Sequence, residues 1–496
     1  MSGELLSATA LRDGAVLRTD VVVIGSGAGG ATFAARVAEA GREVTVLEAG
    51  PAVRTEDFSA NPHEMAVKLY ADSALAATVG FPAIPVYYGR CLGGSTTINS
   101  GTCFRTPDKV FAKWRRAGLA GFSDEALDGW YREVERDLHI AAPPLSLIGR
   151  NAGVMHDVRQ SLGLSGGVIK RNASGCRASG LCCFGCPTGG KQSMLVSAIP
   201  RAIRAGARVL ADCRVDRIVR KGARVVAVEA TVQDGDAARP LLIEADQFVL
   251  SGGAMMSPGL LRRSGLGSPA LGRHLTLHPA LKVAAIMAEE IRPVDGVPQS
   301  YYIDEWHEDG FLIETIAVPP TIEALSLPFA GPRHAALMER VEHMLSWGAM
   351  ISDTSEGRIR FLPGKDLPTY SLNSRDARVA KAAIIRLAWL AFEAGAERVL
   401  TTTYGASEFR SVDDLRRFAR KPIKPSDLDL TAFHPLGTCR MGIDPARSVV
   451  DRDHRVHGLD NLRVVDGSVF PSSLSVNPQW TIMAFALRAA DRLLGR

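Results

Sequence analysis

Residues 20–50, which read DVVVIGSGAGGATFAARVAEAGREVTVLEAG, restrict the fold more than any other part of the chain. The apolar, β-branched run from Val21 to Ile24 is typical of a buried parallel strand. Glycines in a G-x-G-x-x-G pattern follow it, and then come helix formers and a second apolar strand from Val44 to Leu47. These glycines permit a tight turn, the close approach of a pyrophosphate and close packing of the helix on the strand. The stretch therefore predicts a βαβ unit that binds a dinucleotide at the helix N-terminus.

The acidic residue Glu48 directly follows the second predicted strand, 18 residues after Gly30. A carboxylate at this place can accept hydrogen bonds from the hydroxyl groups of a ribose. Both NAD and FAD carry an unphosphorylated ribose, so the fingerprint alone leaves the choice between these cofactors open.

Charge and hydropathy exclude several classes of protein. The 496 residues carry a net charge of +5, and the lysines and arginines are scattered along the chain. A nucleic-acid-binding face needs clustered cations, so we expect no nucleic acid partner. No apolar run reaches the roughly 18–20 residues of a membrane span, and the N-terminus shows no signal peptide. We expect a cytoplasmic protein without a transmembrane segment, an expectation compatible with peripheral membrane association.

Half of the eight cysteines lie within residues 175–190, which read GCRASGLCCFGCPTGG. Their spacing is C-x5-C-C-x2-C-P. A zinc site normally needs separated cysteine pairs or added histidines, and a cytoplasmic location makes disulfides less favoured. The residues alone leave three alternatives, which are a metal cluster, a disulfide pair and a reduced loop with thiols packed inside it.

Four further blocks follow the fingerprint in the chain: GRCLGGSTTINSGTCFRTP at 89–107, GAMMSPGLLRRSGLG at 253–267, HPLGTCRMG at 434–442 and VVDGSVFPSSLSVNPQWTIM at 464–483. Together with the fingerprint, these blocks resemble the glucose–methanol–choline (GMC) family of flavin oxidoreductases, in the family's order and over nearly the whole chain. The first block departs from the family's signature at Cys103 and Thr106, where an aromatic residue and a glycine are usual. Within the family, the bacterial long-chain alcohol oxidases and dehydrogenases are the group that the chain most resembles.

The resemblance implies an α/β fold (α+β overall) with two parts. One is a Rossmann-like FAD-binding domain made of discontinuous segments, residues 15–275 and 430–496, which includes the cysteine-rich loop. The other is a substrate-binding domain, residues 276–429, on an antiparallel sheet with helices. The residues agree, because 281–290 and 310–318 are strand candidates with no helix-length segment of βαβ type between them. Residues 374–394 are typical of a long helix.

The resemblance also implies FAD as the cofactor, bound non-covalently, since no residue resembles the covalent attachment site of some relatives. The expected FAD-binding residues are the ones on the matching motif positions. They are Gly25, Gly27, Ala28, Gly29, Gly30, Glu48, Ala49, Arg90, Gly93, Gly94, Ser95, Asn99, Ser100, Gly101, Thr102, Val215, Gly253, Ala254, Asp466, Gly467, Asn477, Pro478 and Thr481.

His434 and Asn477 fall on the family's two catalytic positions. Oxidation of an alcohol needs a base for the hydroxyl proton while the hydride passes to flavin N5, and histidine titrates in the required range. An amide does not titrate, so His434 is the expected base and Asn477 is expected to orient the hydroxyl. Asn477 could also cap the helix that follows it. A third histidine at a recurrent family position, His278, is expected to be structural.

Within the family, two groups place cysteines where this chain has residues 175–190. Iron–sulfur sugar dehydrogenases hold a cluster there with three cysteines, for which Cys176, Cys182 and Cys186 are the candidates. Long-chain alcohol oxidases carry a similar run with no metal role that we assume. A cluster would imply electron transfer to a partner protein, whereas its absence leaves oxygen or a quinone-like carrier as the acceptor.

The resulting functional expectation is FAD-dependent oxidation of an alcohol (CH–OH) to an aldehyde or ketone, with a primary, fairly apolar alcohol as the substrate. One alternative is an iron–sulfur sugar or polyol dehydrogenase. Another is a non-redox or photochemical enzyme on the same fold, a lyase or a decarboxylase. The Pro-rich stretch PPTIEALSLPFAGP, residues 319–332, is either a lid over an apolar channel or a packed loop.

Overall fold

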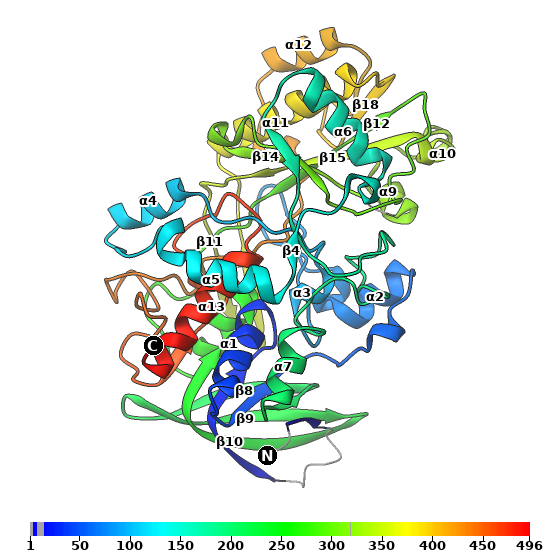
Figure 1. The fold of residues 1–496 in the computed structure, drawn as a ribbon. Helices are drawn as coiled ribbons and strands as arrows, with labels where there is room; N and C mark the ends of the chain where they lie inside the picture. Colours follow the sequence, from blue (N-terminus) through cyan, green and yellow to red (C-terminus); the bar gives the residue numbers. More distant parts are fainter. Residues whose placement is uncertain (1–2, 7–13, 318) are drawn as a thin grey trace.

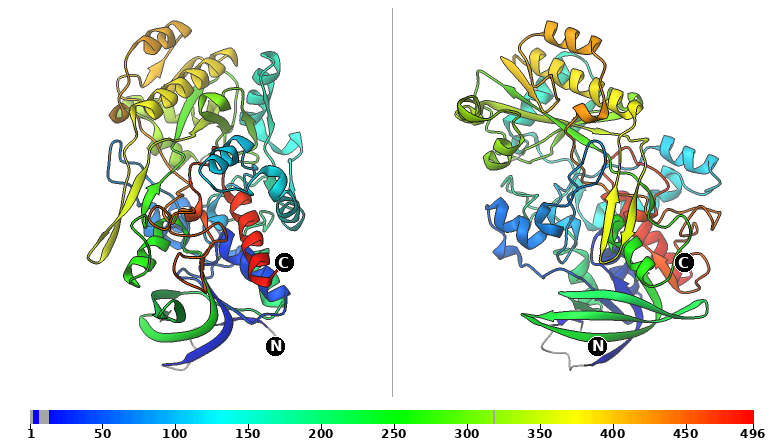
Figure 2. Two further views of the ribbon diagram at one scale, coloured as in Figure 1. Left: turned by 90° about the vertical axis from the view of Figure 1, so that its left-hand side faces the viewer. Right: turned by 180° about the vertical axis from the view of Figure 1, so that it is seen from behind.

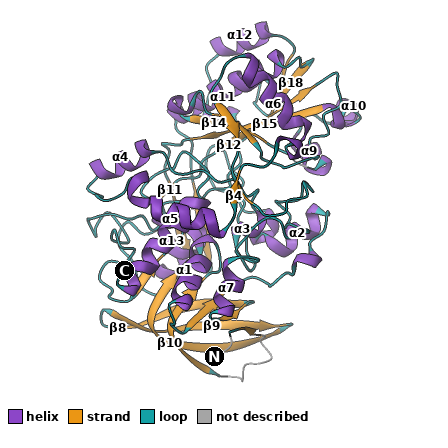
Figure 3. Cartoon of the chain, in the orientation of Figure 1, coloured by secondary structure: helices purple, strands orange, loops and turns teal. Residues whose placement is uncertain are grey.

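Two β-sheets, one above the other, organise the chain in the computed structural model, which describes residues 3–6, 14–317 and 319–496 (Figure 1). The first sheet has the strand order β1-β7-β3-β2-β10-β9-β8, and β20 pairs with β10. The second has the order β19-β18-β12-β15-β14-β13-β5. Helices flank both sheets and long loops run between them (Figure 3). The mixed α/β fold expected from the sequence is therefore confirmed.

The βαβ unit predicted from residues 20–50 is present. Strand β2 (Val16–Ile24) runs parallel to β3 (Val44–Leu47), with helix α1 (Ala28–Glu39) between them. The last four residues of β2 and all four of β3 are buried, as a parallel strand covered on both faces requires. On the far side of β3 lie β7 (Arg208–Leu210) and then β1 (Glu4–Leu6), both parallel.

The strand β10 (Ala237–Leu250) joins distant parts of the chain. Its first half is antiparallel to β9 (Arg224–Asp234), which pairs in turn with β8 (Cys213–Lys221). Its second half is parallel to β2 on one edge and to β20 (Leu462–Val464) on the other. Residues near 20, 250 and 460 thereby become neighbours, which is how separated segments build one dinucleotide-binding unit.

The second sheet is antiparallel throughout. Its strands are β12 (Ala280–Ile286), β13 (Tyr301–Ile303), β14 (Phe311–Thr315), β15 (Met344–Ile351), β18 (Arg398–Thr401), β19 (Glu408–Phe409) and β5 (Gly166–Val168). The predicted strands at 281–290 and 310–318 correspond to β12 and β14, which end earlier than predicted, at Ile286 and Thr315; position 318 of the second prediction lies outside the described residues. Helix α11 (Ser374–Glu393) matches the helix predicted at 374–394 and packs on one face of this sheet.

Several segments cross between the sheets. Strand β5 pairs with β13, and α6 (Gly149–Ser161) packs into the core of the second sheet, although both precede residue 276. The turned views show these segments rising along the second sheet (Figure 2). The other elements are α2 (Pro62–Leu69), α3 (Ser95–Ile98), α4 (Asp108–Arg116), α5 (Asp124–Asp137), α7 (Ala198–Arg204), α8 (Gly253–Arg263), α12 (Val412–Arg420), α13 (Gln479–Leu494), β4 (Ile140–Ala141), β6 (Arg171–Asn172), β11 (Arg273–Leu275), β16 (Gly357–Leu362) and β17 (Lys365–Thr369).

The stretch 319–332 forms α9 (Pro320–Ser326) and the beginning of α10 (Gly331–Met338). Glu323 of α9 is fully buried, and its carboxylate lies 2.7 Å from the ammonium of Lys282 on β12. A buried ion pair with one partner removed would leave an uncompensated charge, so this pair fixes α9 to the sheet. The described part of the stretch is thus packed helix against the second sheet.

In the described residues, no helix is long and apolar enough to cross a lipid bilayer.

The carboxylate of Asp376, in the first turn of α11, ties this helix to the loop that follows β15. It accepts hydrogen bonds from the backbone N–H groups of Thr354 (2.8 Å) and Ser355 (2.7 Å) and from both hydroxyl groups. Asp376→Ala should lower the free energy of unfolding by about 2–4 kcal/mol, because buried donors lose a charged acceptor. Urea unfolding at pH 7 measures this.

Asp413→Ala is the matched control, because Asp413 also lies in a first helical turn but is exposed and pairs only at the surface with Arg416. Its effect should stay below about 0.5 kcal/mol. Equal unfolding midpoints for the two variants would contradict the role assigned to Asp376.

Candidate functional site

Two glycine-rich turns meet where β2 ends. One is the turn from Gly25 to Gly30, and the other contains Gly93 and Gly94, just before α3. A Cβ atom on Gly94 would lie 2.9 Å from the Cα of Gly27, so no larger residue fits between the turns. The backbone N–H of Gly93 donates to the Ser26 hydroxyl at 3.0 Å. No side chain caps α1, so its first N–H groups are available to a phosphate.

The segment after β20 lies against the same turn. A Cβ on Gly29 would lie 1.8 Å from the carbonyl oxygen of Val465, which makes glycine necessary here. The next residue, Asp466, accepts hydrogen bonds from the N–H of Gly253 (2.8 Å) and from the Ser257 hydroxyl (2.6 Å). Burial raises the pKa of Asp466. The structure thus brings together the motif positions at 25–30, 253–254 and 466–467, as a dinucleotide site on this fold requires.

Glu48 is buried at the end of β3 and is held by its neighbours. Its carboxylate accepts hydrogen bonds from the Ser26 N–H (3.0 Å), the Ser26 hydroxyl (2.6 Å) and the Gly50 N–H (3.0 Å). Burial raises the pKa of Glu48. Its carbonyl oxygen accepts from Cys213 N–H at 2.8 Å, which brings β8 and its residue Val215 alongside. The expected contact of Glu48 with a ribose stays a prediction.

The loop 99–102 is tied to the start of α13 by Gln479, a residue that the sequence did not single out. The Gln479 amide donates to the Thr102 carbonyl oxygen (2.8 Å) and accepts from Asn99 (2.8 Å). Helix α13 begins at Gln479, and Pro478 takes the N-cap position without a side-chain hydrogen bond. The expected capping role of Asn477 is therefore wrong.

Among the expected cofactor residues, Thr481 has a side chain that contacts other side chains of the protein. Its hydroxyl lies 2.8 Å from the Thr106 hydroxyl and 2.9 Å from the Tyr131 hydroxyl, and it is fully buried. Arg90, by contrast, lies beside the segment that follows β3, since its guanidinium is 3.5 Å from the Ala49 carbonyl oxygen. The remaining expected positions in the loop, Ser95, Ser100 and Gly101, follow Gly94 in and after α3.

The two histidines His434 and His278 are in ring contact, with centroids 5.4 Å apart. The Nε2 atom of His278 accepts a hydrogen bond from the Leu474 N–H at 2.9 Å, which places the proton of the neutral ring on Nδ1. Burial lowers the pKa of His278 well below its ordinary value and lowers the pKa of His434 to about 4. His434 is therefore neutral at pH 7 and can accept a proton.

Asn477, the other expected catalytic residue, lies beside the carboxyl group of Glu314 on β14. Both side chains are buried, with 6% and 5% exposure. The sequence analysis missed Glu314, because no motif contains it. The one signal for it is a carboxylate inside the apolar strand FLIET, which in a fully buried strand demands a polar partner.

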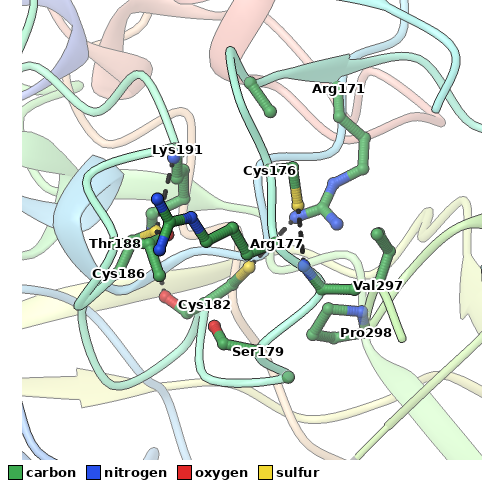
Figure 4. A pocket seen from close by; sticks show the side chains of 13 residues that line it. Arg171, Cys176, Arg177, Ser179, Cys182, Cys186, Thr188, Lys191, Val297 and Pro298 are labelled. Carbon is green, nitrogen blue, oxygen red and sulfur yellow. Dashed lines mark hydrogen bonds between the residues drawn. The ribbon is translucent and has the colours of Figure 1, made fainter. Parts of the chain in front are cut away.

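The cysteine-rich loop forms a small pocket beside the loop 99–102. Cys176, Cys182 and Cys186 line it together with Arg171, Arg177 and Lys191 (Figure 4). The Lys191 ammonium donates to three carbonyl oxygens, those of Thr97 (2.8 Å), Asn99 (2.6 Å) and Cys182 (2.7 Å). All eight cysteines are free thiols, so the disulfide alternative is wrong.

A metal site finds no support in this pocket. Among the residues that the structure describes, no three or more side chains of His, Cys, Asp or Glu are arranged to hold a metal ion. The candidates Cys176, Cys182 and Cys186 share the pocket but are not placed as a ligand set, so the iron–sulfur hypothesis has no structural support.

Three family models match the chain. A model described as GMC oxidoreductase covers residues 66–280, a second with the same description covers 353–486, and one described as FAD binding domain covers 20–61. The chain resembles an uncharacterized GMC-type oxidoreductase of Mycobacterium tuberculosis, with 38% identity over 97% of this chain and 76% of the relative. It also resembles a GMC-type oxidoreductase of Sinorhizobium fredii, with 32% identity over 96% of this chain and 95% of the relative.

More distant similarities agree with these matches. A long-chain-alcohol oxidase of Arabidopsis thaliana is 27% identical over 95% of this chain and 68% of its own length. The crystal structure of pyridoxine 4-oxidase from Mesorbium loti superposes with a TM-score of 0.74, covering 96% of this chain and 99% of that one at 20% identity, which shows a shared fold. The glycine turns, the buried acids and the free helix N-terminus also fit FAD. The chain belongs to the GMC oxidoreductase family of FAD-dependent oxidoreductases.

Proposed function

We propose that this protein oxidises a primary, fairly apolar alcohol to its aldehyde, with FAD bound non-covalently and His434 as the base. The observation that carries the proposal is the neutral imidazole of His434, in ring contact with His278, which is bound to Leu474 three residues before Asn477, on a family fold that binds FAD. A neutral imidazole can take the hydroxyl proton, and a nearby amide can orient the hydroxyl group. Bound FAD would supply the two-electron acceptor that alcohol oxidation requires.

The protein's own residues perform the proton chemistry in this proposal. The Nε2 atom of His278 accepts a hydrogen bond from the Leu474 N–H, and its ring contacts the ring of His434. It thereby holds the base in place without competing for the proton, because its own pKa is depressed further by burial and by His434. His434 is half-buried and its Nδ1 atom is buried, and this desolvation keeps the ring neutral until the substrate delivers its proton.

The names of similar proteins support an apolar substrate. The similar plant proteins are described as long-chain-alcohol oxidases. The division into an FAD-binding part and a substrate-binding part at residues 276 and 429 is retained as a proposal, with α6 and β5 contributing to the substrate side.

Oxygen is the acceptor that we propose. The solved structures with the same fold include a formate oxidase, and the similar plant proteins are described as oxidases. An iron–sulfur relay to a partner protein lacks support, as argued above for the cysteine pocket. A sugar or polyol dehydrogenase of that type is therefore not favoured by any observation of the site.

The proposal predicts that a medium- or long-chain primary alcohol bleaches the visible flavin spectrum of the purified protein under anaerobic conditions. His434→Ala should slow this reduction by about 10²- to 10⁴-fold, the range typical for loss of a general base, while bound FAD is retained. His63→Ala is the matched control, because His63 is exposed on α2. Near-normal reduction in His434→Ala would remove His434 as the base, and no bleaching of the wild type by any alcohol would contradict the proposed function.

The pH dependence of the same reaction tests the state of His434. Its folded pKa is lowered to about 4, so the ring is neutral, and able to accept a proton, at all higher pH values. On the acid side, the rate of flavin reduction should therefore be kept down to about pH 4 and lost as the pH falls through that value. Stopped-flow measurements from about pH 3.5 to about pH 7, a range that includes the ordinary histidine pKa of about 6.5, follow this limb. A loss centred at the ordinary histidine pKa would contradict the burial argument.

A further inference from the structure

The glutamate of β14 faces the proposed site. Along a strand, alternate side chains share a face, so Glu314 lies on the same face as Leu312. Leu312 packs into the core of the first part, whereas Phe311 and Ile313 pack into the core under α11. Glu314 therefore points from the second sheet toward the first, where Asn477 lies.

Glu314 has little beside it that could stabilise a negative charge. Its direct neighbours across the strands are Gly348 on β15 and Tyr302 on β13. Gly348 has no side chain, and beyond it on β12 lies Lys282, whose ammonium is bound to Glu323. The titratable side chains next to Glu314 on the sheet are thus Tyr302 and, two strands away, a lysine that already has a carboxylate partner.

The side chain that meets the Glu314 carboxyl is the Asn477 amide. Two oxygen atoms of this pair, Oε1 of Glu314 and Oδ1 of Asn477, are buried and have no hydrogen-bond partner among the described residues. Both are acceptors when the carboxyl is ionised, and a buried acceptor without a donor is costly. One proton on the carboxyl changes this, because a carboxylic acid O–H can donate to an amide oxygen.

We propose that Glu314, in its protonated form, is the positioning residue for Asn477, which it aims by donating a hydrogen bond to the amide oxygen Oδ1. The amide nitrogen Nδ2 is then turned away from Glu314 and can donate to the hydroxyl oxygen of the substrate. There it stabilises the negative charge that develops on this oxygen as His434 takes the proton. The inference rests on the alcohol oxidation proposed above, and it specifies which atom of the Asn477 amide faces the substrate during that reaction.

The ionised carboxylate would have the opposite effect. It can only accept, so it would attract Nδ2 and leave Oδ1 facing the substrate oxygen, where two acceptors repel. Burial raises the pKa of Glu314 to about 7. A hydrogen bond donated by the amide of Asn477 acts against this rise, and turning Nδ2 away from the carboxyl removes it. A buried carboxyl kept neutral so that it can donate a hydrogen bond is an established device in enzyme sites.

Four proteins test the inference: wild type, Glu314→Gln, Glu314→Leu and the control Glu339→Gln. All are loaded with FAD and reduced anaerobically by a primary alcohol between pH 5 and pH 9, roughly two units either side of neutral. In the wild type, the reduction rate should fall as the pH rises above about 7, because Glu314 ionises. In Glu314→Gln the rate should not fall over this range, because the carboxamide N–H donates to Oδ1 at every pH.

Glu314→Leu cannot donate, so its rate should be about 10- to 100-fold lower at every pH, with a smaller change in KM, as expected for loss of a hydrogen bond that acts in the transition state. Glu339→Gln removes an exposed glutamate at the C-terminal end of α10 and should keep the wild-type pH profile. A fall in Glu314→Gln like that of the wild type, or a wild-type rate in Glu314→Leu, would overturn the inference.

A measurement without substrate separates this inference from the proposed function. A carboxyl whose pKa is raised on folding makes the folded protein less stable as the pH rises from about 5 to about 8. The Tm of Glu314→Gln minus that of wild type should therefore increase over this range. A constant difference would overturn the protonation of Glu314. A wild type that no alcohol reduces would contradict the proposed function, whatever the Tm values show.

Discussion

The closeness of three backbone segments around α1 is the constraint on which the rest of the structure depends. The Gly27 turn touches Gly94, and Gly29 touches the Val465 carbonyl, at distances that leave no room for a Cβ atom. These contacts bring the end of β2, the loop before α3 and the segment after β20 to one point, from sequence positions more than 400 residues apart. The site follows from them, because the segment after β20 accepts a hydrogen bond from Gly437, three residues after His434, and continues through Asn477 into α13.

Burial of the titratable side chains, with few charged groups nearby, determines the protonation states of the site. His434, His278 and Glu314 are all shifted toward their neutral forms by burial. In water each would change its charge with pH near its ordinary value, but here the neutral forms persist over a wider range. A site of neutral donors and acceptors suits a substrate whose own atoms are uncharged, and the charge that develops during the reaction is then met by aimed hydrogen bonds.

The parts that sequence analysis predicted are those with local signals. The βαβ unit, the helix at 374–394 and the strands near 281 and 311 each follow from periodicity, turn residues or both within a short window. Glu314 could not be identified in this way. Its role depends on the pairing of β14 with β13 and β15 and on the direction in which its face of the sheet points. The same holds for Gln479, whose two partners, Asn99 and Thr102, are brought to it by the fold. Strand β5 was missed for a further reason, since three residues rich in glycine carry no strand pattern.

Two buried cations, Lys191 and Arg171, give the cysteine-rich loop a structural role that does not depend on a metal. Lys191 is buried, which lowers its pKa, yet its ammonium is fully occupied by three carbonyl oxygens, two of them in the segment 97–99. The guanidinium of Arg171 likewise donates to the Ser100 carbonyl oxygen and lies 3.2 Å from the Cys182 sulfur. Both cations thus bind the cysteine-rich loop to the loop 99–102, and that loop is bound in turn to α13 through Gln479. The cysteine thiols are small and weakly polar, so both cations can be buried beside them. A carboxylate in their place would attract the cations away from the carbonyl oxygens of residues 97–100.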